Sequence, residues 1–547
     1  MQDSLYAIQN FFSWTTRKSG CIRIHWVVVT LLGIARILCG LAFVLQSKRM
    51  VDIAVGSESG DLWQEAILLI VLIIAELILG FTGSYLNNQA GQLLNNHLRG
   101  QLFHVLLYTP LFNKKDFHSG DLTTRLEEDA RIVTTCITRS LPSAIITLTQ
   151  FVGAFLLLLS FSQRLAWIIV FILPLFIIFS KILGKRLKHM TQVIRRNESL
   201  IQSHLQESLQ HKVLLQALEA EVRSEDKLDG LQKQMYDKVM QRTRFTLTSK
   251  SVLSAGFATG FVVAFLWCCL NLQNGHITFG LMTAFLQLVA KIQGPTARLA
   301  ELMPGFIHAA ASIDRLSEIE RMDIVEKHTS VQLTGVPGIR FGQVNFSYPG
   351  KRHDAVHSFT YDFTPGSHTA IVGPTGAGKT TLFRLILALI HPQKGEIRLY
   401  NGKEETEVST GTRHLMTYVP QGNTLQSGTI RENLLLACPS ATDADLREAL
   451  HTAVADFIYT LPEGLDTPCG ERGYGLSEGQ AQRIAIARGL LKNTPILLLD
   501  EVSAPLDEAT AALLFERLTS KYADRTLILI THRPDSTNYF PEVIHLT

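Results

Sequence analysis

The amino-acid sequence predicts an α-helical transmembrane bundle followed by a soluble α/β domain. Six apolar stretches of about 20 residues lie before residue 306, and each is long enough to cross a hydrocarbon core about 30 Å thick. From residue 339 the pattern changes to short apolar strands separated by helical and turn segments. Composition agrees with this division, because 46% of the 547 residues are hydrophobic and only 18% are charged.

The same composition argues against several functional classes. The formal net charge is +3, from 51 basic and 48 acidic residues, so no extended positive field favours nucleic acid as a partner. The seven cysteines form no C-x-x-C pair and have no zinc-like spacing with histidine. We therefore expect neither a disulfide scaffold nor a structural zinc.

The first half of the chain is interpreted as two parts. Residues 1–21 form an interfacial helix, and residues 22–305 form a membrane domain. Segment 1–21 lacks the basic start and small-residue cleavage site of a secretory signal. Loops rich in Lys and Arg stay in the cytoplasm, and the connections after the second and fourth spans are the basic ones, so both termini are expected inside the cell. The predicted spans cover residues 22–47, 62–86, 140–161, 165–183, 252–272 and 279–303.

The charged residues Arg36 and Glu76 fall inside predicted spans. Ionisable groups at membrane depth are costly and are therefore candidates for a function. The favoured interpretation is that the two pair with each other and hold helices together, and a role in binding substrate is the alternative.

The soluble part, 339–547, contains a phosphate-binding loop of the form G-x-x-x-x-G-K-T between a strand and a helix. Its glycines let the backbone approach phosphate, while N–H groups at the helix N-terminus and the Lys379 ammonium attract negative charge. The Thr380 hydroxyl is a candidate Mg²⁺ ligand. The loop comprises Gly373, Pro374, Thr375, Gly376, Ala377, Gly378, Lys379 and Thr380, with Thr381 next to it.

A second site element is the apolar strand PILLLDE, which ends in Asp500 and Glu501. Ligands bind beyond the carboxyl ends of parallel strands in such folds. We therefore expect Asp500 to hold Mg²⁺, and Glu501 to position or deprotonate an attacking water.

The stretch LSEGQ at 476–480 resembles the signature of ABC transporters, usually written LSGGQ, and the whole chain resembles an exporter-type half-molecule of that family. The resemblance implies that Tyr348 stacks on adenine, that Gln421 links the Mg²⁺ site to the intracellular helices, and that His532 contacts the γ-phosphate. It also assigns Ser477, Gly479, Gln480 and Asp507 to nucleotide binding, and the GERG stretch at 470–473 matches a further family motif.

The same resemblance implies a domain-swapped dimer, because each ATP is sandwiched between the phosphate loop of one cassette and the signature of another. The second half-transporter could be an identical chain or a related one. Coupling regions are expected near 112–129 and 209–220, and a linker over 306–338. Three departures from the family pattern bear on rate and coupling: Glu478 replaces a glycine, Ala504 and Pro505 replace Ser-Ala, and the cassette is short after His532.

The expected function is ATP-driven export or flipping by alternating access, with ATP and Mg²⁺ as cofactors, membrane lipids as surroundings and a bacterial inner membrane as location. Lipid, amphipathic small molecule and peptide remain open as the transported substrate. The alternatives are an ATP-gated channel or regulatory subunit on the same scaffold, and a soluble-type ABC ATPase, which the six spans disfavour.

Overall fold

A computed structural model describes residues 13–110, 119–325, 329–349, 354–422, 424–470 and 475–546. The chain divides into two compact units: a helical one with Met1–His104 and His118–Arg321, and a mixed α/β one with Met322–Thr547, to which Val105–Phe117 is also assigned. Each unit is described by itself.

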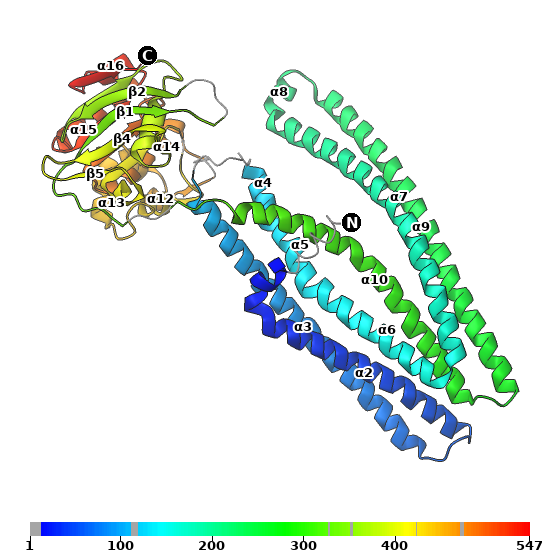
Figure 1. The fold of residues 1–547 in the computed structure, drawn as a ribbon. Coiled ribbons are helices and arrows are strands. Elements are labelled where there is room, and N and C mark those ends of the chain that lie inside the picture. Colours follow the sequence, from blue (N-terminus) through cyan, green and yellow to red (C-terminus); the bar gives the residue numbers. More distant parts are fainter. Residues whose placement is uncertain are drawn as a thin grey trace. The chain divides into compact units, whose positions relative to one another are not determined.

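The helical unit contains one long helix for each predicted span (Figure 1). The longest have 47, 48 and 53 residues, or about 70 to 80 Å at 1.5 Å per residue, so they extend well beyond a bilayer core. These helices are α2 (Arg23–Ala54), α3 (Leu62–Tyr108), α6 (Leu141–Phe161), α7 (Gln163–Gln210), α9 (Glu221–Gln273) and α10 (Phe279–Glu320). Shorter pieces are η1 (Ser19–Ile22), α4 (Ser119–Thr124), η2 (Arg125–Asp129), α5 (Ala130–Thr135), η3 (Cys136–Ser140) and α8 (Lys212–Ala217).

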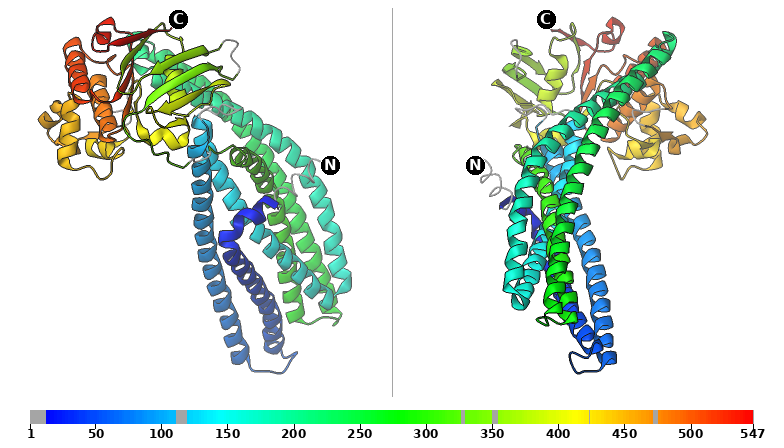
Figure 2. Two further views of the ribbon diagram at one scale, coloured as in Figure 1. Left: turned by 60° about the vertical axis from the view of Figure 1, so that its left-hand side comes forward. Right: turned by 90° about the vertical axis from the view of Figure 1, so that its right-hand side faces the viewer.

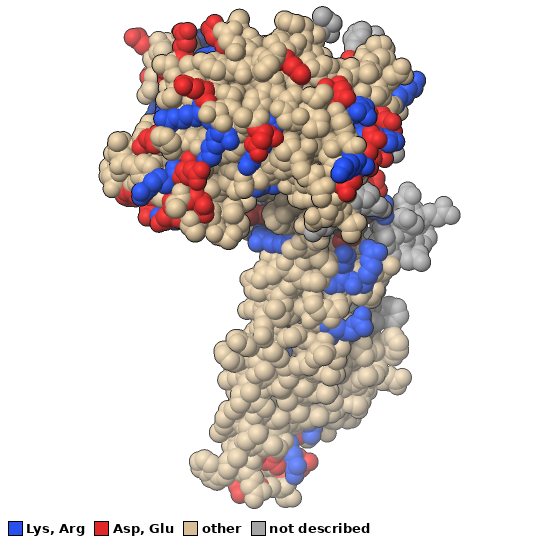
Figure 3. Space-filling view, turned by 90° about the vertical axis from the view of Figure 1, so that its left-hand side faces the viewer, with Lys and Arg blue, Asp and Glu red and all other residues tan. Residues whose placement is uncertain are grey.

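Length and hydropathy identify four helical stretches as able to cross a membrane: Ser13–Ala54, Leu62–Tyr108, Asp121–Phe161 and Glu221–Gln273. The other two predicted spans lie within α7 and α10 and include residues whose side chains the structure does not describe. On the face shown in Figure 3, the middle of the helical unit carries almost no charged side chains. Such a surface suits contact with lipid.

Helices α2, α6 and α10 pack around an apolar core that includes Val44, Leu158, Phe285 and Leu288. Helices α7 and α9 run side by side as a long pair (Figures 1 and 2). The most apolar stretch of α3, by contrast, contains no residue buried within this single chain.

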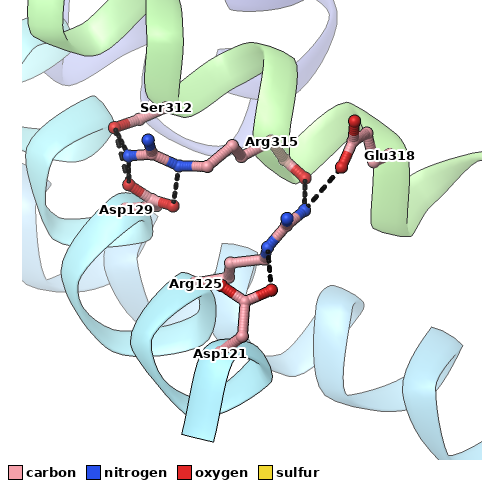
Figure 4. A network of polar contacts seen from close by, with 6 residues as sticks. All are labelled: Asp121, Arg125, Asp129, Ser312, Arg315 and Glu318. Carbon is pink, nitrogen blue, oxygen red and sulfur yellow. Dashed lines mark hydrogen bonds and ion pairs between the residues drawn. The ribbon is translucent and has the colours of Figure 1, made fainter. Parts of the chain in front are cut away.

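A polar network joins the segment before α6 to the end of α10 (Figure 4). Asp129, 2% exposed, accepts hydrogen bonds from Ser312 Oγ at 2.8 Å and Arg315 Nε at 2.7 Å. Arg125 donates to Asp121 at 2.9 Å and to Glu318 at 2.8 Å. The network therefore fastens the first predicted coupling region to α10.

The structure corrects or limits several predicted boundaries. Helix α10 continues to Glu320, so 306–320 of the predicted linker is helical. In this part of α10 the buried apolar residues Ala309, Ile313 and Leu316 recur every three or four positions and so lie on one face of the helix. Helix α8 lies within 209–220, as expected for a turn between long helices. Residues 1–12 of the N-terminal segment and 111–118 of the first coupling region lie outside the described residues.

The second unit has two main sheets, as the alternating strand and helix pattern predicts. An antiparallel sheet has the order β2-β1-β4-β5, and a parallel sheet has the order β11-β3-β10-β9-β6. The strands are β1 (Gly338–Phe346), β2 (Val356–Phe363), β3 (His368–Val372), β4 (Lys394–Tyr400), β5 (Glu405–Glu407), β6 (Met416–Val419), β7 (Gly428–Thr429), β8 (Pro468–Cys469), β9 (Ile496–Asp500), β10 (Thr526–Ile530) and β11 (Glu542–His545). The helices are α11 (Lys379–Ile386), α12 (Ile430–Leu435), α13 (Asp443–Thr452), α14 (Glu478–Leu491), α15 (Glu508–Lys521) and α16 (Pro534–Thr537).

The central strands β9 and β10 are buried at every position, which explains the apolar runs ILLL and LILI within them. Ile530 of β10 pairs with Asp500 of β9 on one side and with Ile371 of β3 on the other. The segments that follow these three strands, beginning at Gly373, Glu501 and Thr531, therefore meet at one edge of the sheet.

Candidate nucleotide site

The phosphate loop leaves β3 and ends where α11 begins. Gly376 and Gly378 have φ of +93° and +83°, a region that glycine adopts readily. A Cβ on Gly378 would lie 2.0 Å from the Ala355 carbonyl oxygen, so only glycine fits there. These two positions give the loop the backbone shape in which successive N–H groups can turn toward an anion.

Lys379, the first residue of α11, is buried inside this loop. Its Nζ donates to the carbonyl oxygens of Gly373 at 2.8 Å and Pro374 at 2.9 Å. Burial lowers the pKa of the Lys379 ammonium below its ordinary value, against the attraction of Asp500 and Glu501. An ammonium held this way can turn from carbonyl oxygens to phosphate oxygens and recover strong charge-assisted contacts.

Asp500 and Thr380 lie together as the predicted Mg²⁺ site requires. Thr380 Oγ1 is 3.4 Å from Asp500 Oδ1, and the Tyr418 hydroxyl donates to Asp500 Oδ2 at 3.2 Å. Burial raises the pKa of Asp500 and that of Tyr418. No group of three or more His, Cys, Asp or Glu residues suited to a metal occurs in the described part of the chain. One carboxylate and one hydroxyl fit Mg²⁺, which keeps water and phosphate oxygens as its remaining ligands.

Glu501 is held at both of its carboxylate oxygens. His532 Nε2 lies 2.7 Å from Oε1, and Gln421 Nε2 donates to Oε2 at 2.7 Å. The Glu501 backbone has φ of +49° and its N–H bonds to the Ile530 carbonyl at 2.9 Å. The three predicted catalytic residues are thus brought together, one after each of the neighbouring strands β6, β9 and β10.

Tyr348 lies after β1 with its ring half-buried. Its hydroxyl is 2.8 Å from Thr381 Oγ1 and accepts from Arg384 Nη1 at 3.1 Å, both on α11. Its ring is perpendicular to that of Phe346, with ring centroids 5.0 Å apart. These contacts fix Tyr348 beside the helix that carries the phosphate loop, and its role in stacking on adenine stays a prediction.

The signature segment forms the start of α14. Ser477 caps this helix: its Oγ accepts from Gln480 N at 3.2 Å, and Gln480 Oε1 accepts from Ser477 N at 2.9 Å. A Cβ on Gly479 would lie 2.7 Å from the Pro505 carbonyl oxygen, so this glycine permits close approach of the next loop. Glu478 is exposed in the first turn.

Asp507 caps α15 by accepting from Thr510 N at 2.9 Å and Thr510 Oγ1 at 2.7 Å, and these bonds lower its pKa. Among the described residues, no hydrogen bond or ion pair joins Ser477, Gly479 or Gln480 to Lys379 or Glu501. Residues 471–474 of the GERG motif and its flank lie outside the described part of the chain.

Sequence reasoning missed Tyr418, which binds the Asp500 carboxylate. The available signal was its place in the stretch YVPQ, three residues before Gln421. Strand β6 neighbours β9 in the sheet, and Tyr418 pairs with Leu498, which brings its side chain within reach of Asp500.

Comparisons with known proteins agree with both halves of the chain. Residues 26–296 match the ABC transporter transmembrane region, and residues 356–504 match the ABC transporter cassette family. The transmembrane match excludes the alternative of a soluble-type ABC ATPase. The fold is similar to a solved bacterial Atm1-family ABC exporter with ATP bound, with a TM-score of 0.79, 22% identity, and coverage of 96% of this chain and 94% of that one.

Curated relatives include the uncharacterized ABC transporter ATP-binding protein YknV of Bacillus subtilis, 30% identical over 86% of this chain and 79% of the relative. An ATP-dependent lipid A-core flippase of Pseudomonas fluorescens gives the same identity and coverage. A serine protease/ABC transporter B family protein, tagA of Dictyostelium discoideum, is 30% identical over 90% of this chain, which spans 28% of that protein's length. The chain therefore belongs to the ABC transporter family, as an exporter-type membrane protein whose cassette binds ATP and couples its hydrolysis to transport.

Proposed function

We propose that the chain is one half of an ATP-driven exporter or flippase for a lipid, an amphipathic small molecule or a peptide. The second half is an identical or related chain, and the membrane is a bacterial inner membrane with the cassette and both termini in the cytoplasm. Relatives named as lipid A-core flippase and multidrug export protein support a hydrophobic or amphipathic cargo. The basic loops on one side of the predicted spans support the orientation.

In this proposal the loop from Gly373 to Thr381 holds the phosphates, with Lys379 supplying positive charge. Thr380, Asp500 and Gln421 hold Mg²⁺, which when bound neutralises charge on the phosphate oxygens. Glu501 orients and deprotonates the attacking water. The remaining predicted contacts are Tyr348 on adenine, His532 on the γ-phosphate, and Ser477, Gly479, Gln480 and Asp507 across the dimer.

Alternating access follows from differential binding. ATP favours the state in which two cassettes close around it, because only that state supplies donors from both a phosphate loop and a signature helix. Hydrolysis removes this preference and lets the cassettes separate. The helices that extend beyond the bilayer, α3, α7, α9 and α10, are the elements that can carry this movement to the membrane.

The observation that carries the proposal is the fixed carboxylate of Glu501, held by His532 and Gln421. Replacing it in Glu501→Gln keeps the size of the side chain and one acceptor oxygen but removes the base. We expect ATP binding to persist while hydrolysis falls by about 10²- to 10⁴-fold, measured as phosphate release in nanodiscs. Glu508→Gln, an exposed acid in the first turn of α15, is the matched control. Unchanged turnover in Glu501→Gln would reject the assigned role.

A channel gated by ATP makes a different prediction for flux. An exporter accumulates cargo against a gradient in inverted vesicles only when ATP is hydrolysed, so Glu501→Gln stops accumulation. A gated channel would instead pass cargo down its gradient in that variant as soon as ATP binds.

A further inference from the structure

Three ionisable side chains from three helices converge in the membrane half of the chain. Arg36, Glu76 and Lys291 each lie near the middle of a predicted span, on α2, α3 and α10. Arg36 Nε is 3.5 Å from Glu76 Oε1, which confirms the predicted pairing. A Cβ on Gly40 would lie 3.2 Å from Lys291 Nζ and 3.8 Å from Glu76 Oε2. The two side chains therefore share the space that Gly40 leaves open.

The charged cluster lies on the side of α3 that is turned toward α2 and α10, and not on its exposed apolar side. Glu76 is half-buried and lies one turn before Gly80 on the same face of α3. Gly80 contacts Arg36, because a Cβ on Gly80 would lie 3.3 Å from Arg36 Cζ. Ile74 and Leu77, on the other side of α3, are 49% and 68% exposed. Apolar side chains of that kind suit lipid, so the charged stripe points toward α2 and α10.

The cluster has an excess of positive charge. One carboxylate serves two cations, and Lys291 forms no hydrogen bond or ion pair with any described residue. The Arg36 and Glu76 side chains remain 51% and 40% exposed, so the pair is open on one side. At this depth such an opening is tolerated where it lines a water-filled cavity, since a charge open to hydrocarbon is strongly disfavoured.

We propose that Arg36 and Lys291, with Glu76 as their counter-ion, bind the anionic head group of an amphipathic cargo, a phosphate or a carboxylate joined to an apolar tail. The proposal rests on the export function and specifies its cargo class. Arginine presents several N–H donors in a plane that matches the oxygens of such groups. Sites near the middle of the membrane, lined by several helices, are where transporters hold their substrates.

The test measures direct binding of radiolabelled oleoyl lysophosphatidic acid to the full chain in phosphatidylcholine nanodiscs. Oleoyl lysophosphatidylcholine has the same tail with a neutral head, and inorganic phosphate has the charge without the tail. We expect the lysophosphatidic acid to bind at least about tenfold more tightly than either, because its contacts with Arg36 and Lys291 are charge-assisted.

Variants separate a binding role from a packing role. Lys291→Gln and Arg36→Gln should each weaken lysophosphatidic acid binding about tenfold or more, while Lys291→Arg retains it. Glu76→Gln should strengthen binding severalfold, because it removes the only anion of the cluster. Arg49→Gln is the control, since this residue pairs with Glu65 at 3.2 Å on the same helix α2 but beyond the predicted span; its affinity should match that of the unmodified chain.

Equal binding of the two lysolipids, or of Lys291→Gln and Arg49→Gln, would overturn the site. Weaker binding in Glu76→Gln would do the same, because the pair would then serve helix packing alone. If inorganic phosphate bound as tightly as lysophosphatidic acid, the proposal that the cargo needs an apolar tail would be overturned. ATP turnover by the unmodified chain is measured in parallel: turnover without charge-selective binding rejects only this site, whereas charge-selective binding without turnover rejects the exporter function and leaves the site in place.

Discussion

Arg315 donates through two nitrogens of its guanidinium to both carboxylate oxygens of Asp129, a residue that is almost wholly buried. The pair joins segments 186 residues apart in the sequence, and Ser312 adds a third hydrogen bond to the same carboxylate. A buried carboxylate that loses its cation is left without compensation, so the environment of Asp129 at the junction between η2 and α10 depends on Arg315, while Arg125 supplies a separate contact to Glu318.

Replacing that arginine in Arg315→Gln should lower the free energy of unfolding by about 1–3 kcal/mol. The loss stays moderate because Arg315 is half-exposed, which screens its charge, and because Ser312 still donates to Asp129. Thermal unfolding in detergent measures the effect. Arg321→Gln, an exposed arginine at the end of the same helix, is the control. Equal melting temperatures for the two variants would contradict a structural role for the pair.

Replacing His532 by alanine should slow ATP hydrolysis by about 10²-fold and leave the affinity for ATP nearly unchanged. The reason is that His532 holds Glu501 at one oxygen and leaves the phosphate loop untouched. Steady-state phosphate release gives kcat and KM separately. His545→Ala, at an exposed position on β11, should behave like the unmodified chain. A rise in KM with kcat preserved would place His532 in ATP binding and not in hydrolysis.

Gly479→Ala should abolish most ATP turnover while ATP still binds to the phosphate loop. The new methyl group would press on the Pro505 carbonyl oxygen and displace the start of α14, which is the surface that a second cassette requires. Binding of a fluorescent ATP analogue and phosphate release, measured on one preparation, distinguish the two effects. Ala481→Gly, in the same helix, tests whether general weakening of α14 has an equal consequence.

Glu478→Gly should lower the KM for ATP severalfold at low ionic strength. The exposed carboxylate is the first residue of α14, and in the proposed dimer it repels phosphate oxygens across the interface. Salt screens exposed charges over about 10 Å at 0.1 M, so the difference from the unmodified chain should shrink as salt is added. A difference that is constant from low to high salt would show that the backbone, and not the charge, is responsible.

Asp500→Asn should stabilise the nucleotide-free protein at neutral pH and reduce its stabilisation by Mg²⁺ and ATP. Burial raises the pKa of Asp500, so its contribution to stability is present below the ordinary carboxyl pKa of about 3.9 and is lost as the pH rises through the raised value. The gain from the substitution should therefore vanish in acid. Melting temperatures from pH 4 to pH 7, with and without Mg²⁺ and ATP, check both parts. If Asp500→Asn were less stable than the unmodified chain at pH 7, the predicted direction of the stability change would be wrong.

The sequence predicts those features that depend on local patterns. Long apolar windows identify the helices, and the strand that ends in Asp500 and Glu501 places both acids at the sheet edge. Tyr418 was not anticipated because its partner, Asp500, comes from another strand, and Lys291 was not anticipated because the residues that surround it come from other helices. The continuation of α10 into 306–320 was also missed, since charged residues on its outer face conceal the buried stripe that contains Ile313 and Leu316. What escaped prediction was decided by tertiary packing.

The backbone of Glu501 has a φ of +49°, a conformation that lowers the stability of the cassette at a residue assigned to ATP hydrolysis. Glycine or asparagine would occupy that conformation with less strain, and holding another residue there costs about 1–3 kcal/mol. The rest of the sheet supplies that energy to aim one carboxylate at its two partners. Selecting variants only for thermostability would therefore favour replacing Glu501 with a residue that suits this backbone conformation. Such variants would be more stable but would no longer hydrolyse ATP.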